Sequence, residues 1–196
     1  AVCYVLEGNV TSSGDTLRWL TEEAGLASSL EEVEQLSRQT PDTEGVYLVP
    51  AFSGLGAPYQ RPGARAIICG LSRGSARRHI ARAALESIAY QDADILRAME
   101  RDTGRRVEEL RVDGGPTANT ELMQFLANLT GCKVRCARHS ELSALGAARM
   151  AGEALGIFEP EQSPEQGMVF LPACDEAWRE GKLMGWEAAV TRSYDQ

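Results

Sequence analysis

The chain has 196 residues, of which 43% are hydrophobic, and this is enough for one globular domain with an ordinary buried core. Its formal net charge of -8 and pI near 4.9 disfavour nonspecific binding to nucleic acid or to an anionic membrane, because the long-range field repels polyanions. No apolar run approaches ~18 residues and the first ten residues lack a signal-peptide pattern, so we expect a cytoplasmic protein with no nucleic-acid or membrane partner.

The first half of the chain predicts short strands and amphipathic helices in alternation, separated by glycine and proline turns. We expect, in chain order, a strand over 2–8, a helix over 12–26, an acidic helix over 28–39 and strands over 45–53 and 66–71. Leu30, Val33 and Leu36 recur at helical spacing and mark the apolar face of the second helix. The segment GLGAPYQRPGAR, between the two later strands, has the glycines and prolines of a long ordered loop.

The second half carries the longest predicted helix, over 79–101, whose apolar residues lie mostly along one stripe. The elements expected after it are a strand over 109–114, a helix over 119–131, a strand over 133–137, a small-residue helix over 140–156 and a closing helix over 175–194. Trp178 and Trp186 are the expected packing anchors of the last helix. This alternation predicts an α/β fold with parallel strands and helices packed on the sheet.

Cysteines and histidines give little sign of metal or catalytic chemistry. The five cysteines include no CxxC pair, and Cys132 and Cys136 would point to the same face of a strand. A metal site there is one interpretation, but no zinc spacing supports it, so buried free thiols are the better one. His79 and His139 are the two histidines, and each is expected to be a structural or surface residue.

One turn carries the strongest local signal for a ligand, in the stretch RVDGGPTANTELMQFLANLTG over 111–131. Gly114 and Gly115 follow a predicted strand and lead into a helix, so bare backbone lies at the carboxyl edge of a sheet, where open α/β folds bind ligands. Asn119 is a natural helix cap there, and its amide can instead bind a ligand. The alternative is a tight turn with an ordinary cap, since neither GxGxxG nor GxxxxGK[ST] is present.

Four segments together carry a resemblance to a known family: VPAFSGLGAPYQRPGARAIICGLSRG, HIARAALESIAYQ, ELRVDGGPTANTELMQFLANLTG and SALGAARMAG. In this order and spacing the chain resembles the C-terminal domain of the glycerol kinase branch of the FGGY carbohydrate kinases. The resemblance implies an actin/hexokinase-like (ribonuclease H-like) α/β domain, with a mixed central sheet flanked by helices. It also implies that residues 1–196 are a single nucleotide-binding domain and that the N-terminal substrate domain, with the catalytic aspartate, is absent from this chain.

The resemblance assigns a nucleotide-binding role to five positions. Gly115 and Asn119, with Gly114 beside them, match the family's contacts to the adenosine end of ATP, and Gly14 matches a glycine whose backbone approaches the phosphates. Arg18 stands where these kinases usually have glutamine, and is either a charge-assisted phosphate contact or a solvated helix residue. The small residues of the SALGAA segment, Ala144, Gly146 and Ala147, resemble a helix packed near the nucleotide pocket, although close helix packing alone explains them equally well.

The function that the resemblance implies is transfer of the γ-phosphoryl group of Mg²⁺-bound ATP to a primary hydroxyl of a small polyol, glycerol in the first place. The polyol would bind mainly to the missing domain, so this chain alone is expected to hold no catalytic residue and to be inactive. Gln60-Arg61 replaces a Trp-Asp pair that is usual after GAPY, which keeps two alternatives open. These are a kinase for another polyol or sugar, and a non-catalytic nucleotide-binding or interaction module of the same family. A homo-oligomer is also compatible with the sequence.

Overall fold

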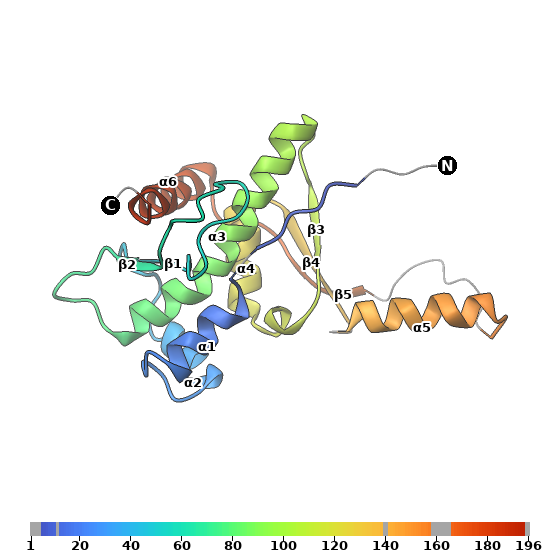
Figure 1. Ribbon diagram of the computed structural model, residues 1–196, viewed down its shortest axis with the longest axis horizontal. Helices are drawn as coiled ribbons and strands as arrows, with labels where there is room; N and C mark the ends of the chain where they lie inside the picture. The colour runs from blue at the N-terminus through green and yellow to red at the C-terminus, as the bar shows by residue number, and fades with distance from the viewer. Residues whose placement is uncertain (1–4, 11, 139–140, 158–165, 195–196) are drawn as a thin grey trace. The chain divides into compact units, whose positions relative to one another are not determined.

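The computed structural model describes residues 5–10, 12–138, 141–157 and 166–194, which form two compact units (Figure 1). The helical unit comprises the described residues up to Val107 and from Cys174 onward, and the sheet unit comprises those from Glu108 to Ala173. The chain therefore builds most of the helical unit, then the sheet unit, and returns to complete the first. A single functional domain over 1–196 stays a prediction.

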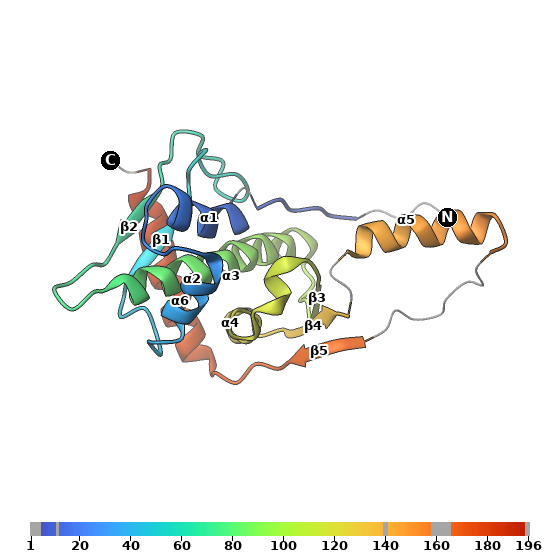
Figure 2. The ribbon, with the colours of Figure 1, turned by 90° about the horizontal axis from the view of Figure 1, so that it is seen from below.

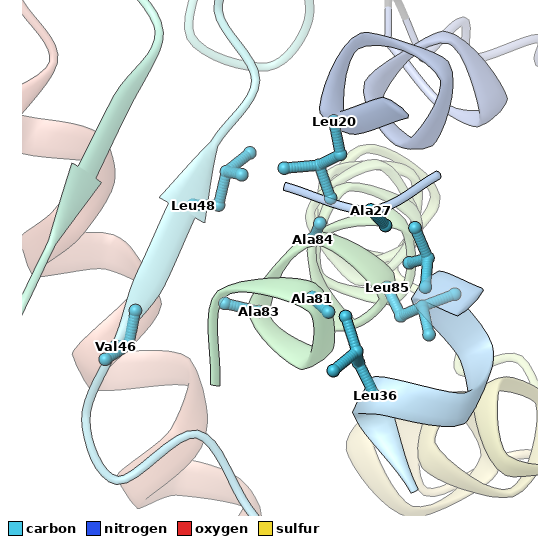
Figure 3. Packing of buried hydrophobic residues seen from close by; sticks show 10 residues of the cluster. Leu20, Ala27, Leu36, Val46, Leu48, Ala81, Ala83, Ala84 and Leu85 are labelled. Atoms are coloured by element: carbon cyan, nitrogen blue, oxygen red, sulfur yellow. The ribbon is translucent and has the colours of Figure 1, made fainter. Parts of the chain in front are cut away.

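The helical unit is organised around one long helix, α3. Its elements are α1 (Gly14–Glu22), α2 (Leu30–Ser37), β1 (Tyr47–Val49), β2 (Ile67–Cys69), α3 (Arg77–Thr103) and α6 (Glu176–Arg192). In Figure 3, α3 lies between β1 on one side and α1 and α2 on the other, with Leu48 and Leu20 reaching toward it. Ala81, Ala83 and Ala84 are almost completely buried on α3, and such small side chains let neighbouring elements approach the helix closely.

Local sequence signals explain where these helices begin and end. Ser29 caps α2 by accepting a hydrogen bond from the backbone N–H of Glu32 (3.2 Å), and the Glu32 carboxylate accepts one in return from the N–H of Ser28 (2.7 Å). Gly104 ends α3 in the left-handed conformation, with φ of 65°. Asp175 caps α6 by accepting a hydrogen bond from the N–H of Trp178 (2.9 Å).

An aromatic cluster joins α6 to α3 and β1. Trp186 is 1% exposed and stacks on Tyr90, with ring centroids 4.9 Å apart and planes inclined by 5°. Tyr47 of β1 packs against the same Tyr90, with ring centroids 5.8 Å apart. Trp186 is thus the packing anchor predicted for this helix, whereas Trp178 is half-buried beside Lys182.

The sheet unit has a three-stranded mixed sheet in the order β3–β4–β5. Its elements are β3 (Glu109–Val112), the short 3₁₀ helix η1 (Gly115–Ala118), α4 (Thr120–Thr130), β4 (Lys133–Ala137), α5 (Leu142–Ala154) and β5 (Gln166–Phe170). β3 and β4 are parallel and α4 is the crossover between them, while β5 runs antiparallel to β4. Figure 2 shows α4 beside β4, where Val134 and Cys136 are buried.

On the opposite face of β3 and β4, the carboxylate of Glu109 binds two basic side chains. Glu109 pairs with Lys133 across the strands, with a Nζ to Oε2 distance of 2.6 Å. The same carboxylate accepts hydrogen bonds from Nε and Nη2 of Arg135 at 3.0 and 3.2 Å. These hydrogen bonds from Arg135 and Lys133 lower the pKa of Glu109 to about 2.

Most of the predicted elements are confirmed, and the structure differs from the expectations in three respects. The strand expected over 2–8 is wrong where it can be judged: residues 5–8 form no strand and Val5 and Leu6 are exposed, and residues 2–4 lie outside the described residues. Leu30, assigned to the apolar face of α2, is 48% exposed because it is the first residue of the helix. β5 was not predicted. Its antiparallel direction, like that of the β1–β2 pair, differs from the parallel strands that the alternation predicts and agrees with the mixed sheet that the resemblance implies.

The cysteine and histidine interpretations have clear outcomes. Cys132 and Cys136 are buried free thiols, as predicted, and burial raises the pKa of the Cys136 thiol. His79 is a buried structural residue whose Nδ1 accepts a hydrogen bond from the N–H of Ala76 (2.9 Å) at the start of α3. Cys3 and His139 lie outside the described residues. Within the described ranges, no helix is long and apolar enough to cross a membrane.

Candidate functional site

The glycine turn connects the carboxyl end of β3 to the start of α4. Gly114 has a φ of 88° and a ψ of 179°, a conformation that residues with a Cβ rarely adopt. The carbonyl of Gly114 then accepts hydrogen bonds from the N–H (3.1 Å) and the hydroxyl (2.7 Å) of Thr117. These bonds fix the 3₁₀ turn, so Gly114, Gly115 and Asn119 are held together in one rigid connection.

Asn119 has two polar atoms with different roles. Its Oδ1 accepts a hydrogen bond from the N–H of Leu122 (3.0 Å) and so caps α4, as the sequence indicates. Its Nδ2 is buried and has no hydrogen-bond partner among the described residues, although Asn119 as a whole is only 4% exposed. A buried donor without a partner costs about 1–3 kcal/mol, a cost that an acceptor placed against this amide would offset.

Gly115 leaves room for a flat group against the backbone. It is exposed, its φ is not in the left-handed region, and no described atom lies within 4 Å of the position that a Cβ would take. The nearby acidic side chains Asp113 and Glu121 disfavour an anion at this turn. The turn therefore suits the uncharged, hydrogen-bonding part of a ligand better than its phosphates.

The start of α1 forms the second predicted set, and it lies in the helical unit. Gly14 is exposed and no described atom lies within 4 Å of its would-be Cβ. The first N–H groups of a helix have no acceptor one turn earlier, and here that of Thr16 donates to the carbonyl of Ser13 (3.1 Å). Asp15 is exposed and adds a negative charge to the first turn of α1, and its carboxylate accepts a hydrogen bond from the N–H of Ser13 (2.7 Å). Arg18 lies one turn further and its side chain is 68% exposed, 3.8 Å from Glu22.

Arg18 therefore has the position and freedom to reach an anion at the start of α1. Its pairing with Glu22 is a surface (i, i+4) ion pair, which contributes only about 0.3–0.5 kcal/mol and is easily exchanged for a phosphate contact. Both interpretations of Arg18 are compatible with this geometry. The structure brings Gly14 and Arg18 together, and separately brings Gly114, Gly115 and Asn119 together.

Two features of the helical unit were not anticipated from the sequence. Thr16, in the first turn of α1, is completely buried, and its Oγ1 has no partner among the described residues. Gln91 of α3 donates a hydrogen bond to the carbonyl of Ser12 (2.7 Å), two residues before Gly14. Neither feature has a local sequence signal, because each depends on a contact between segments far apart in the chain.

A small pocket of about 20 Å³, enough for one water molecule, adjoins the 54–62 loop. Its lining includes Tyr59, Gln91, Asp94 and Trp186. One oxygen of Asp94, Oδ2, accepts hydrogen bonds from Nε1 of Trp186 (2.7 Å) and from the hydroxyl of Tyr59 (2.9 Å). Burial raises the pKa of Asp94, and the two hydrogen bonds oppose that rise.

The Gln60-Arg61 pair lies in the same loop. Gln60 has a φ of 52°, and the backbone N–H and carbonyl of Arg61 pair with those of Leu55 at 2.8 and 2.9 Å. The Arg61 guanidinium lies over the ring of Tyr194, 5.1 Å from its centroid. Arg61 thus connects the loop to the residues that follow α6.

The small residues of α5 lie on an exposed surface of the helix. Ala144, Gly146 and Ala147 are exposed, and no element among the described residues covers them. Their smallness permits close packing but does not by itself provide a partner. The described residues also contain no cluster of three or more His, Cys, Asp or Glu side chains able to hold a metal ion.

Comparison with known proteins relates this geometry to one family. The model of the FGGY family of carbohydrate kinases, C-terminal domain, matches residues 1–155. The glycerol kinase of Pseudomonas syringae pv. tomato is 48% identical over 99% of this chain, and that of Alkalilimnicola ehrlichii is 48% identical over 97%. The chain spans only 40% and 39% of the length of these two relatives.

Solved structures give the same result for the fold. The glycerol kinase of Plasmodium falciparum, crystallised with ADP, matches 93% of this chain and 37% of its own, with a TM-score of 0.84 and 35% identity. The xylulose kinase of Lactobacillus acidophilus matches 92% of this chain and 39% of its own, with a TM-score of 0.77 and 21% identity, and supports the fold alone. The actin/hexokinase-like α/β class and the mixed sheet are therefore confirmed.

Proposed function

The chain belongs to the FGGY family of carbohydrate kinases as a C-terminal domain, and on that premise we propose that it forms the ATP-binding half of a glycerol kinase-like enzyme. The complete enzyme transfers the γ-phosphoryl group of ATP to a primary hydroxyl of a small polyol. Glycerol is the proposed acceptor, because the relatives at 47–48% identity are glycerol kinases. The substrate-binding and catalytic groups belong to the rest of the enzyme, so the chain alone is inactive.

The observation that carries the proposal is the unpartnered Nδ2 of Asn119 beside the open backbone of Gly115. An adenine ring offers nitrogen acceptors on its edge and a flat face, and these match a buried N–H donor next to a glycine without neighbours. Because Oδ1 of the same side chain is fixed by the cap on α4, Nδ2 is held in one direction before the ligand arrives. Such preorganisation lowers the entropic cost of binding.

The phosphates are proposed to lie at the start of α1, where Gly14 leaves space beside the backbone and Arg18 offers an exposed positive charge. Mg²⁺ is proposed to arrive with ATP, since this ion keeps several waters and binds through phosphate oxygens more than through all-protein cages. In phosphoryl transfer the protein chiefly positions groups and stabilises charge. Gly14 and Arg18 would contribute to both, and Gly115 and Asn119 to positioning.

The test separates the donor role of Asn119 from its role as a cap. Asn119→Ser keeps a capping oxygen but removes the amide, so we expect normal unfolding by urea and about 5- to 10-fold weaker ADP binding in the full-length protein. Gly115→Val fills the open space without demanding a strained φ, and is expected to weaken ADP binding more strongly. Titration calorimetry with Mg²⁺ and ADP measures both.

Gly181→Val is the matched control, because Gly181 lies on α6 and also has open space around its would-be Cβ. It should leave ADP binding unchanged. Failure of the wild-type full-length protein to bind ADP would contradict the kinase proposal. Binding of ADP without ATP-dependent phosphorylation of glycerol, other polyols or sugars would instead support a non-catalytic nucleotide-binding module, and phosphorylation of another acceptor would reassign the substrate.

A further inference from the structure

The side chain of Gln91 is held in one orientation by two hydrogen bonds. Its amide nitrogen, Nε2, donates to the carbonyl of Ser12 at 2.7 Å and to the carbonyl of Ser87, one turn earlier on α3, at 3.1 Å. Both hydrogens of the amide group are therefore used. The bond to Ser87 fixes the side chain to its own helix, so the bond to Ser12 anchors a different segment of chain to α3.

The anchored carbonyl lies immediately before the predicted phosphate-binding turn. Ser12 is 3% exposed, and Ser13 follows it with its N–H bonded to Asp15 at 2.7 Å. The Ser12–Ser13 peptide unit is thus oriented from two directions, its carbonyl by Gln91 and its N–H by Asp15. The next residue is Gly14, which is exposed and has no described atom within 4 Å of its would-be Cβ.

Orientation matters more at this turn than in an ordinary loop. A ligand contact through backbone N–H groups depends on the direction of each peptide plane, and a misplacement of about 1 Å can reduce an enzymatic rate by roughly 100-fold. Gly14 has no side chain to pack and so does little to fix its own position. The anchor at Ser12 supplies that constraint from α3.

We propose that Gln91 is a positioning residue that sets the direction of the Ser12–Gly14 backbone for contact with the phosphates of a nucleotide. The inference rests on the proposed function, because it needs phosphates at the start of α1. It adds to that function a residue that does not touch the ligand and that acts through the carbonyl of Ser12. Its signature is a loss of affinity for the phosphate part of the nucleotide alone.

The experiment compares ADP with adenosine in the full-length protein, by calorimetric titration with Mg²⁺. Gln91→Leu removes both donors at nearly constant volume, and Gln91→Glu keeps the shape but places a carboxylate oxygen against the Ser12 carbonyl at pH 8. Both variants are expected to bind ADP about 10-fold more weakly than wild type, while adenosine affinity changes less than about 2-fold.

Gln124→Leu is the matched control. Gln124, on α4, also donates from Nε2 to a distant backbone carbonyl, that of Leu171 at 2.8 Å, but is not connected to Ser12. It should lose comparable stability to urea and keep the wild-type ratio of ADP to adenosine affinity. The control separates a general effect of losing an amide anchor from an effect on the phosphate-binding turn.

The other outcomes are distinguishable. If wild type binds ADP more tightly than adenosine and both Gln91 variants keep that preference, the role of Gln91 is refuted while the proposed function stands. If the variants lose ADP and adenosine affinity equally, Gln91 is a structural anchor only. If wild type itself does not prefer ADP to adenosine, the phosphate placement in the proposed function fails, and the inference fails with it. Should Gln91→Leu not fold, Gln91→Glu alone decides between these outcomes.

Discussion

Replacing Asp94 with alanine tests whether one carboxylate oxygen holds three segments of the helical unit together. Oδ2 of Asp94 accepts hydrogen bonds from Trp186 of α6 at 2.7 Å and from Tyr59 of the 54–62 loop at 2.9 Å, while Asp94 itself lies on α3. The substitution removes both acceptor interactions at once. It leaves the N–H of Trp186, whose side chain is buried, without its partner.

The expected cost follows from the two bonds. A hydrogen bond to a charged group contributes about 1.5–3 kcal/mol, but the Tyr59 hydroxyl can turn toward the adjoining pocket and recover part of its bond with water. Burial of the Asp94 charge also costs free energy, as its raised pKa indicates, and the substitution relieves that cost. We expect Asp94→Ala to lower the free energy of unfolding by about 3 kcal/mol. For a chain of this length that corresponds to a fall in Tm of about 6–12 °C.

Urea and thermal unfolding at pH 7 measure the loss, and a double-mutant cycle assigns it. Tyr59→Phe and Trp186→Phe should each destabilise the wild type by about 1–2 kcal/mol. In the Asp94→Ala background each should cost at least 1 kcal/mol less, because the partner is already absent. Additive effects in both cycles, or a loss below about 1 kcal/mol for Asp94→Ala, would show that the shared oxygen does not join the three segments.

Three further predictions concern titration and backbone strain. Burial raises the pKa of Asp92 from 3.8 to about 6, so the protein loses stability as the pH rises from 4 to 6, where Asp92 ionises more readily in the unfolded chain than in the folded one. At about 1.4 kcal/mol per pH unit, Asp92→Asn should be about 3 kcal/mol more stable than wild type at pH 7 and no more stable below pH 4. Urea unfolding across pH 4–8 checks this, and a gain independent of pH would contradict it. Hydrogen bonds from Arg135 and Lys133 lower the pKa of Glu109 to about 2, so its contribution is present above pH 4.5 and lost as the pH falls toward 2. Glu109→Gln should therefore flatten the acid unfolding curve between those values, and an unaltered acid midpoint and slope would argue against the cluster. Gly70→Ala places a Cβ against the backbone carbonyl of Gly45 at a φ of 80°, whereas Gly104→Ala meets open space at a φ of 65°, so calorimetry should find the first clearly more destabilising than the second, which should cost about 1 kcal/mol. Equal costs would mean that the close approach at Gly70 is unimportant.

Sequence patterns predicted the helices well because their determinants are local. The 3.6-residue periodicity, the Asn119 cap of α4 and the left-handed glycine Gly131 after it all lie within a few residues of the element that they define. The same holds for the glycine turn, whose Gly114 conformation follows from the residue type. These features need no knowledge of the rest of the chain.

Features that depend on distant partners were missed or only half correct. β5 has no strong alternating pattern, and Gly167 in it is required by the close approach of the Cys136 carbonyl on the neighbouring strand. The apolar segment over 5–8 has the composition of a strand, but composition cannot supply a neighbouring strand to pair with. The polar contacts of Gln91 and Asp94 join residues 79 and 92 positions apart, and no local motif marks them.

The same long separation affects how a newly made chain reaches its folded state. α3 emerges from the ribosome well before α6, and Trp186 follows its partner Asp94 by 92 residues. At synthesis rates of about 5–20 residues per second, the delay is about 5–20 s, far longer than helix formation requires. During that interval the ring of Tyr90 lacks the cover of Trp186. A chain that ends before α6 therefore has no Trp186 to stack on Tyr90.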